Sequence, residues 1–208
     1  LRRRVEEQGL ACETLDAVRL TTLCQGGHHQ GVVAEVAKLP VMDDRSLFDL
    51  VTGKSNPMLC VLDNIQGPRN LGACLRTAEA AGVDAVVLSR HDSCGITPVV
   101  RQVSAGAAEL IPLARISNIV RVLTHLQKEL GIWVVGTAGG STRALFDIDL
   151  SAPLAMAFGS EGKGLKRLTL ECCDCVGSIP MAGKIESLNV SVAVGIGLFE
   201  SVRQRRSR

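Results

Sequence analysis

The chain has 208 residues, of which 46% are hydrophobic and 21% charged, and its formal net charge at pH 7 is +2. This composition is that of a globular protein, and no apolar run approaches the roughly 20 residues that a membrane-spanning helix needs. The N-terminal stretch LRRRVEEQGL has no apolar segment after its basic residues, so we expect a cytoplasmic protein without a secretory signal. The small positive charge permits nucleic-acid binding but does not argue for it.

The eight cysteines do not predict a metal site. Most of them stand singly among apolar neighbours, and the cluster CCDC (Cys172, Cys173 and Cys175) lacks a second ligand pair at zinc-finger spacing. We therefore expect reduced thiols and no bound metal.

The first part of the chain resembles the end of a small α/β domain. Residues 1–40 contain a helix-like LRRRVEEQG and a strand-like VVAEVAKL, and residues 41–56 look like a linker with one short amphipathic helix. From residue 57 onward apolar runs of strand length alternate with helical patterns, which predicts a parallel sheet covered by helices. The expected strands are 58–63, 84–89, 109–113, 132–137, 153–158 and 175–180, and the expected helices are 71–81, 97–105, 118–130, 164–172 and 188–203.

The helix expected after the first of these strands carries an unusual arginine. Asn70 stands where an N-cap would be, and Gly72 and Arg76 are four residues apart, on a face that the apolar pattern does not use. A helix start with a glycine and an arginine suits an anion such as phosphate. Alternatively, Arg76 forms a surface pair with Glu79.

Three glycine-containing or polar loops follow the late strands, where open α/β sheets bind ligands. They are VVGTAGG, AFGSEGKGL and SIPMAGKIESLNVS. The second has the order G-x-x-G-x-G, which reverses the dinucleotide fingerprint and disfavours a Rossmann oxidoreductase. It suits either an adenine-bearing ligand or a tight strand-to-helix turn.

The last helical pattern is apolar nearly all round. Ser187 is its expected N-cap, and Leu188, Val192, Phe199 and Val202 mark only one of several apolar faces. A helix of this kind must be buried on both sides, which predicts packing against a second copy of the chain.

NLGACLR, AFGSEGKGL and IPMAGKIESLNVSVAVGI together resemble, in this order and spacing, the three motifs of the SpoU/TrmH branch of the SPOUT RNA methyltransferases. The resemblance covers roughly residues 57–204. Within the branch the chain is similar to the bacterial enzyme that methylates a guanosine 2'-hydroxyl in large-subunit (23S) ribosomal RNA. HHQGVVAEV is similar to the end of the L30e-like RNA-binding domain that such enzymes carry in front.

The resemblance implies a C-terminal trefoil knot, bound S-adenosylmethionine and a homodimer whose active site draws on both subunits. It places the catalytic positions of the family at Asn70, Arg76, Glu161, Ser187 and Asn189. It places cofactor contacts at Thr137, Gly139, Gly159, Ile179, Met181 and Leu188.

The resemblance therefore implies that Arg76 faces the cofactor of the partner subunit and an RNA phosphate. A guanidinium is a poor base at neutral pH, so we expect Arg76 to grip the phosphate and stabilise the developing alkoxide. The alternatives are the same chemistry on transfer RNA and a non-catalytic RNA-binding member of the family.

Overall fold

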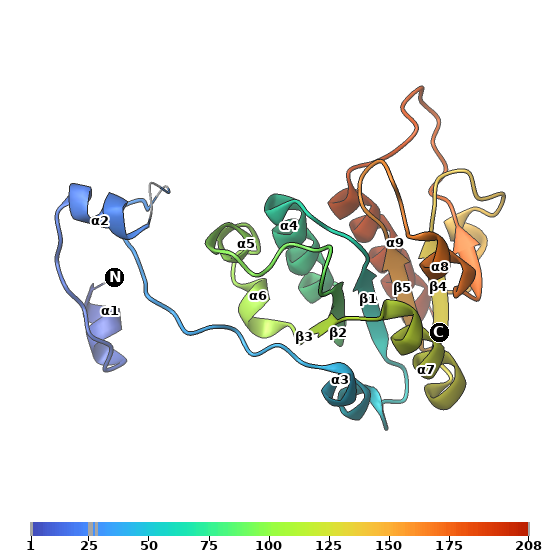
Figure 1. Cartoon of the computed structure of the whole chain (residues 1–208), viewed down its shortest axis with the longest axis horizontal. Helices are drawn as coiled ribbons and strands as arrows, with labels where there is room; N and C mark the ends of the chain where they lie inside the picture. The colour runs from blue at the N-terminus through green and yellow to red at the C-terminus, as the bar shows by residue number, and fades with distance from the viewer. Residues whose placement is uncertain (1, 25–26, 28, 208) are drawn as a thin grey trace. The chain divides into compact units, whose positions relative to one another are not determined.

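The computed structural model describes residues 2–24, 27 and 29–207, and it divides into two compact units, residues 1–38 and residues 39–208. Figure 1 shows the elements in chain order. Within the described ranges, no helix is both long and apolar enough to cross a membrane.

The N-terminal unit contains two short helices, α1 (Arg2–Glu7) and α2 (Ala17–Leu23). Asp16 caps α2 by accepting a hydrogen bond from the amide of Arg19. The strand expected at residues 32–39 is not formed, and that prediction was wrong: the segment runs without regular structure. A strand needs a neighbour that pairs with its backbone, and the described part of this unit contains no strand at all.

The second unit is built on six parallel strands. These are β1 (Met58–Leu62), β2 (Ala85–Ser89), β3 (Leu113–Ile116), β4 (Trp133–Thr137), β5 (Leu154–Phe158) and β6 (Cys175–Gly177). Their order across the sheet is β3-β2-β1-β5-β4-β6. The predicted α/β class with a parallel sheet is confirmed. Because β1, β5, β4 and β6 are neighbours, the loops that follow them meet at one edge.

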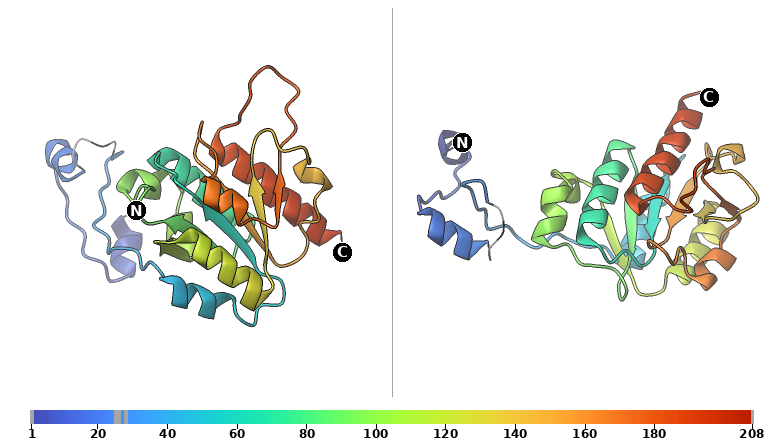
Figure 2. Two further views of the ribbon diagram at one scale, coloured as in Figure 1. Left: turned by 45° about the vertical axis from the view of Figure 1, so that its right-hand side comes forward. Right: turned by 90° about the horizontal axis from the view of Figure 1, so that it is seen from above.

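Helices cover both faces of this sheet (Figure 2). One face carries α4 (Pro68–Ala80), α5 (Pro98–Val103), α6 (Ala107–Leu110) and α9 (Val190–Arg206). The other carries α3 (Asp44–Val51), α7 (Ile119–Leu130) and α8 (Arg167–Glu171). Alternate strand residues enter the two cores, which is why the strands are apolar on both sides.

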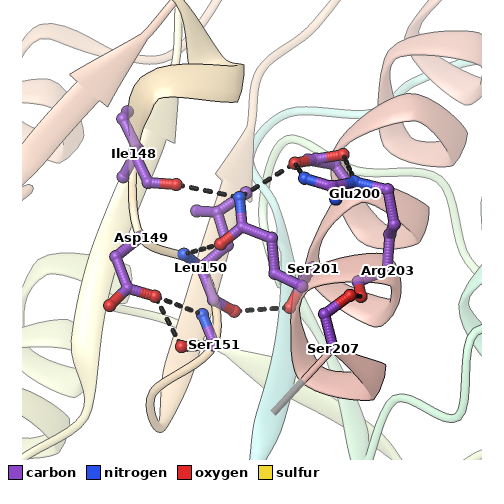
Figure 3. A network of polar contacts seen from close by, with 9 residues as sticks. Ile148, Asp149, Leu150, Ser151, Glu200, Ser201, Arg203 and Ser207 are labelled. Atoms are coloured by element: carbon purple, nitrogen blue, oxygen red, sulfur yellow. Dashed lines mark hydrogen bonds and ion pairs between the residues drawn. The ribbon is translucent and has the colours of Figure 1, made fainter.

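The C-terminal part of helix α9 is held to the loop before β5 by hydrogen bonds (Figure 3). This loop includes a short 3-10 helix, η1 (Leu145–Asp147). The buried hydroxyl of Ser201 donates to the carbonyl of Leu150 at 2.7 Å. The carboxamide of Gln204 accepts from the Leu150 amide and donates to the Ile148 carbonyl. Arg203 is held beside Glu200 on the same helix.

Several element boundaries differ from the prediction. Residues 109–113 do not form a strand: Ala107–Leu110 is a helical turn after Gly106, whose φ is +94°, and β3 begins only at Leu113, after Pro112. The residue at the N-cap of α4 is Gly67, with Pro68 in the first turn, so Asn70 is already inside the helix. The N-cap of α9 is Asn189 and not Ser187.

Gly72 also serves a purpose that differs from the prediction. It is buried, and a Cβ at this position would lie 2.8 Å from Cβ of Val103 and 2.9 Å from the carbonyl oxygen of Val100. The glycine therefore lets α5 pack closely on α4 instead of admitting a ligand.

Candidate functional site

The side chain of Asn189 connects the starts of two helices with the loop after β5. Its amide group donates to Oδ1 of Asn70 at 3.0 Å and to a carboxylate oxygen of Glu161. Its oxygen accepts from the amide and the hydroxyl of Ser191, which caps α9. Three of the five expected catalytic residues are thus held together by one carboxamide.

The loop that carries Glu161 owes its shape to Gly159. A Cβ at this position would lie 1.9 Å from the carbonyl carbon of Gly164, so only glycine fits. Ser160 and Gly164 close the loop with two backbone hydrogen bonds of 3.1 and 2.9 Å. The tight turn alone accounts for Gly159.

A buried carboxylate anchors the far end of the same loop. Asp63, at the end of β1, is 1% exposed and accepts hydrogen bonds from the hydroxyl of Thr169 and the backbone amide of Lys166. The ammonium group of Lys166 binds Asp92, in the loop after β2, and lowers the pKa of that carboxyl below its usual value. The position of Glu161 is therefore supported by three neighbouring strand ends.

Glu161 is close enough to α4 to influence Cys74. Burial and, to a lesser extent, the negative charge of Glu161 together raise the pKa of the Cys74 thiol to about 12. Cys74 remains a protonated core residue at neutral pH, so it is not a nucleophile of the site.

A pocket of about 220 Å³ opens beside this network. Asn70 and Glu161 line it together with residues 64–67, Ser160, Lys163 and Val190. Asn64 has a φ of +65°, an uncommon conformation for a residue other than glycine. Ser160 Oγ is buried without a hydrogen-bond partner among the described residues.

Arg76 and Ser187 are not brought into the network. Both are exposed, and within the part of the chain that the structure describes their side chains have no hydrogen-bond or ion-pair partner. The alternative pair between Arg76 and Glu79 is not formed. The Arg76 guanidinium is available to a ligand or to another chain.

The six expected cofactor residues lie at the end of β4 and in the segments that follow the adjacent strands β4, β5 and β6. Thr137 ends β4, Gly159 follows β5, and Ile179 is two residues beyond β6. The hydroxyl of Thr137 donates to the Ala157 carbonyl, which ties β4 to β5. Gly139 lies under the segment that follows β6, since a Cβ there would be 3.7 Å from the carbonyl oxygen of Glu186.

The segment from Ile179 to Leu188 fits an adenosine-like ligand. No residue in this described segment makes a hydrogen bond, so its backbone donors and acceptors are open to another molecule. Ile179 and Leu188 are half-buried, and Met181 is 39% exposed. Unpaired backbone groups beside apolar side chains are what an adenine and a methionine chain require.

The three sequence motifs do not contain Asp63, Asn64 or Gln66. Asn64 and Gln66 stand between a buried strand and a proline. Polar residues at such a place are typical of turns, so the sequence pattern does not indicate a role in binding. Asp63 directly follows the apolar MLCVL, and a charge at that place was a usable signal of a ligand-side strand end. Among the described residues, no group of three His, Cys, Asp or Glu side chains could hold a metal ion.

Comparison with known proteins gives matches over both units. Residues 57–199 match the SpoU rRNA Methylase family, and residues 1–42 match a family described as RNA 2'-O ribose methyltransferase substrate binding. The chain is 46% identical over 205 residues to the 23S rRNA (guanosine-2'-O-)-methyltransferase RlmB of Shewanella oneidensis, covering 99% of this chain and 83% of the relative. It is 51% identical over 181 residues to RlmB of Pseudomonas putida, covering 86% and 73%.

Comparison with solved structures points to the same kind of protein. The SpoU methyltransferase AviRb from Streptomyces viridochromogenes, crystallised with the cofactor AdoMet, superposes with a TM-score of 0.71 at 29% identity, covering 77% of this chain and 65% of its own. An AdoMet-bound rRNA methyltransferase from Sinorhizobium meliloti gives 0.71 at 28% identity, covering 79% and 61%. The present chain thus spans most of its RlmB relatives and just under two thirds of AviRb. With a family match over most of the second unit and relatives near half identity, the chain belongs to the SpoU rRNA methylase family.

Proposed function

We propose that this chain transfers a methyl group from S-adenosylmethionine to the 2'-hydroxyl of a guanosine in 23S ribosomal RNA. The observation that carries the proposal is the Asn70–Asn189–Glu161 network, which joins one residue from each of the three motifs within the range that matches the family. The RlmB relatives, at 46% and 51% identity, support the substrate. A ribosomal RNA substrate also implies a cytoplasmic location.

Thr137, Gly139, Gly159, Ile179, Met181 and Leu188 would hold S-adenosylmethionine. When bound, the cofactor supplies a methyl group on a positively charged sulfur, which a ribose oxygen can displace. The residues of the chain have to orient that oxygen in line with the methyl group and stabilise its growing negative charge.

Arg76 is the residue that stabilises the negative charge developing on the ribose oxygen. Its guanidinium has no partner among the described residues and offers a planar fork of N–H donors, so it can bind the adjacent phosphate through two N–H groups and stabilise the alkoxide. The 2'-hydroxyl proton leaves to phosphate or water. Asn189, Asn70 and Glu161 form the wall of the site, and Ser187 stands at the start of the segment leading into α9.

Arg76 reaches its target in a homodimer. Helix α9 packs on α4 and the sheet through Val190, Val194 and Leu198, while Val192 and Phe199 on its outer side are 48% and 47% exposed. An apolar outer side of this kind suits a second copy, which would place the Arg76 of one chain against the cofactor of the other. Light scattering is expected to give the mass of two chains, and a monomer with full activity would contradict the dimer.

The same proposal includes the trefoil knot and the two-domain layout. Ser178 exchanges backbone hydrogen bonds with Arg143 and Leu145, and Glu186 crosses Gly139, so the segment after β6 runs closely against the loop after β4. Such contacts support a threaded chain, which tracing of an experimental electron-density map would test. We assign residues 1–40 to an L30e-like RNA-binding domain, 41–56 to a linker whose helix α3 packs on the sheet, and 57–208 to the methyltransferase domain.

The test is methyl transfer to defined RNA. The chain is incubated with labelled S-adenosylmethionine and either unmodified 23S ribosomal RNA or transfer RNA, and the label is located by nuclease digestion and mass spectrometry. Label on one guanosine ribose of 23S RNA is expected. Label only in transfer RNA would overturn the substrate, and cofactor binding without transfer to either RNA would favour a non-catalytic member.

A further inference from the structure

We propose that the pocket beside the Asn70–Asn189–Glu161 network receives the base of the target nucleotide, and that the carboxamides of Asn64 and Gln66 read its hydrogen-bonding edge. The inference rests on the proposed function, because it assigns a base-recognition subsite to the same reaction. It adds Asn64 and Gln66, which neither the motifs nor the catalytic network include.

The pocket has the size and position for a base. Its volume of about 220 Å³ is below the roughly 300–1,000 Å³ of most ligand pockets, so it suits one part of a nucleotide better than a whole cofactor. Asn70 and Glu161 belong to both the pocket and the network. A base seated here therefore has its own ribose next to the residues that act on the 2'-hydroxyl.

The pocket contains polar groups that lack partners. Ser160 Oγ is buried and unpaired among the described residues, an arrangement that costs stability unless a ligand supplies the hydrogen bond. Buried Ile65 and Val190 offer apolar surface for the plane of a base.

Asn64 and Gln66 are joined and still leave groups free. Nε2 of Gln66 donates to Oδ1 of Asn64 at 3.3 Å. This bond leaves the oxygen of Gln66 as an acceptor and the amide group of Asn64 as a donor, since neither has another partner in the described ranges. Single-stranded RNA is read by such contacts to the edge of an unstacked base.

The hydrogen-bonding groups of the pocket, including the carboxylate of Glu161, favour guanine. The Watson–Crick edge of guanine presents two neighbouring donors, N1–H and the N2 amino group, next to the O6 acceptor. Gln66 can accept from the N2 amino group and the second carboxylate oxygen of Glu161 from N1–H, while Asn64 can donate to O6. Adenine and cytosine present a ring nitrogen lone pair instead of N1–H, which a carboxylate repels.

Lys163 completes the subsite at its rim. Its ammonium group is exposed and lines the pocket, where a nucleotide phosphate would follow the ribose. Its contribution is independent of the base, whereas that of Asn64 and Gln66 depends on it.

The experiment is a double-mutant cycle that combines a substitution in the protein with a change of the target base. Wild type, Asn64→Ala, Gln66→Ala and the exposed control Gln102→Ala are compared on an RNA fragment carrying the guanosine that the methylation experiment locates, and on the same fragment with inosine there. Inosine lacks only the N2 amino group. All four proteins must show the same rise in melting temperature with S-adenosylmethionine, which excludes misfolding.

We expect inosine to lower kcat/KM of the wild type and of Gln102→Ala by about 10-fold, in line with the loss of one base contact. Gln66→Ala should lose a similar factor on guanosine and little more on inosine. Asn64→Ala should reduce activity on guanosine by about 10-fold and retain the inosine effect in part, because its contact is to O6.

Equal losses on both RNAs, multiplying with the inosine effect, would overturn base reading in favour of a backbone contact. Full activity of both variants would overturn the subsite while leaving the proposed function intact. If the wild type methylates no RNA at all, the proposed function fails, and the subsite with it.

Discussion

The amide group of Asn189 donates to Oδ1 of Asn70 at 3.0 Å, and this single contact joins the beginnings of α4 and α9 across the site. The oxygen of the same side chain caps α9. Asn189 therefore has a structural function and a positioning function that different substitutions can separate.

We expect Asn189→Ser to keep the cap and lose the bridge. A serine hydroxyl caps a helix well but is too short to reach both Asn70 and Glu161. Because misplacement of a site by about 1 Å can cost on the order of 100-fold, we expect kcat to fall by about that factor while the melting temperature changes little. The matched control is Asn118→Ser, the equivalent cap of α7, where Asn118 accepts from the amide of Arg121. Equal activity of the two variants would contradict the bridge.

The substitution Arg76→Lys tests whether the guanidinium binds a phosphate through two N–H groups. Lysine keeps the positive charge but cannot bind a phosphate through two parallel N–H groups, so we expect kcat at saturating RNA and cofactor to fall by at least about 10-fold. Stability should not change, because Arg76 is exposed and has no partner among the described residues. Arg121→Lys, on α7 at the other face of the sheet, is the control. Near-wild-type activity of Arg76→Lys would argue against a two-point grip.

Much of the fold could be predicted because strand and helix periods are strong signals. The runs MLCVL and AVVLS, buried on both faces, became β1 and β2. The helix caps were less predictable, since SLNV offers two polar residues and only the contacts of Asn189 with Asn70 and Glu161 decide between them. The strand expected at residues 109–113 is not formed, and the reason is local. Gly106, at φ +94°, precedes a helical turn whose alanines pack into the core.

The candidate site was predictable only where motifs carried it. Asn70, Glu161 and Asn189 come from three different motifs, and the structure brings them together. In the sequence, Asn64 and Gln66 look like ordinary turn residues. Only the fold brings them into one pocket with Asn70 and Glu161.

Gly159→Ala should damage the cofactor loop more than the core. The added methyl group would collide with the backbone of Gly164 and Leu165, at 1.9 and 2.0 Å, so the turn must open. Overpacking of this kind typically costs about 1–3 kcal/mol, and we expect S-adenosylmethionine binding, measured by calorimetry, to weaken at least about 10-fold. In Gly95→Ala the nearest atom would be 3.9 Å from the new Cβ, so this control should bind normally. Normal binding by Gly159→Ala would show that the loop does not shape the cofactor site.

The hydrogen bonds between Arg203 and Glu200 give α9 a pH-dependent contribution to stability (Figure 3). These bonds hold the pKa of Glu200 below its usual value of 4.5. A carboxyl group whose pKa is depressed by folding stabilises the native state fully above the unfolded value, and that stabilisation is lost as the pH falls through the folded value. Glu200→Gln should therefore melt lower than the wild type at pH 7.

The difference between the wild type and Glu200→Gln should shrink as the pH falls below about 4.5, because the wild-type carboxyl is then protonated as well. The difference at pH 7 should be small, since Arg203 is 65% exposed and water screens the pair. Differential scanning calorimetry between pH 3 and pH 7 measures it, with exposed Glu129→Gln on α7 as the control. A difference that stays the same down to pH 3 would mean that Glu200 stabilises the helix end through the hydrogen bond it accepts from Gln204, independently of its charge.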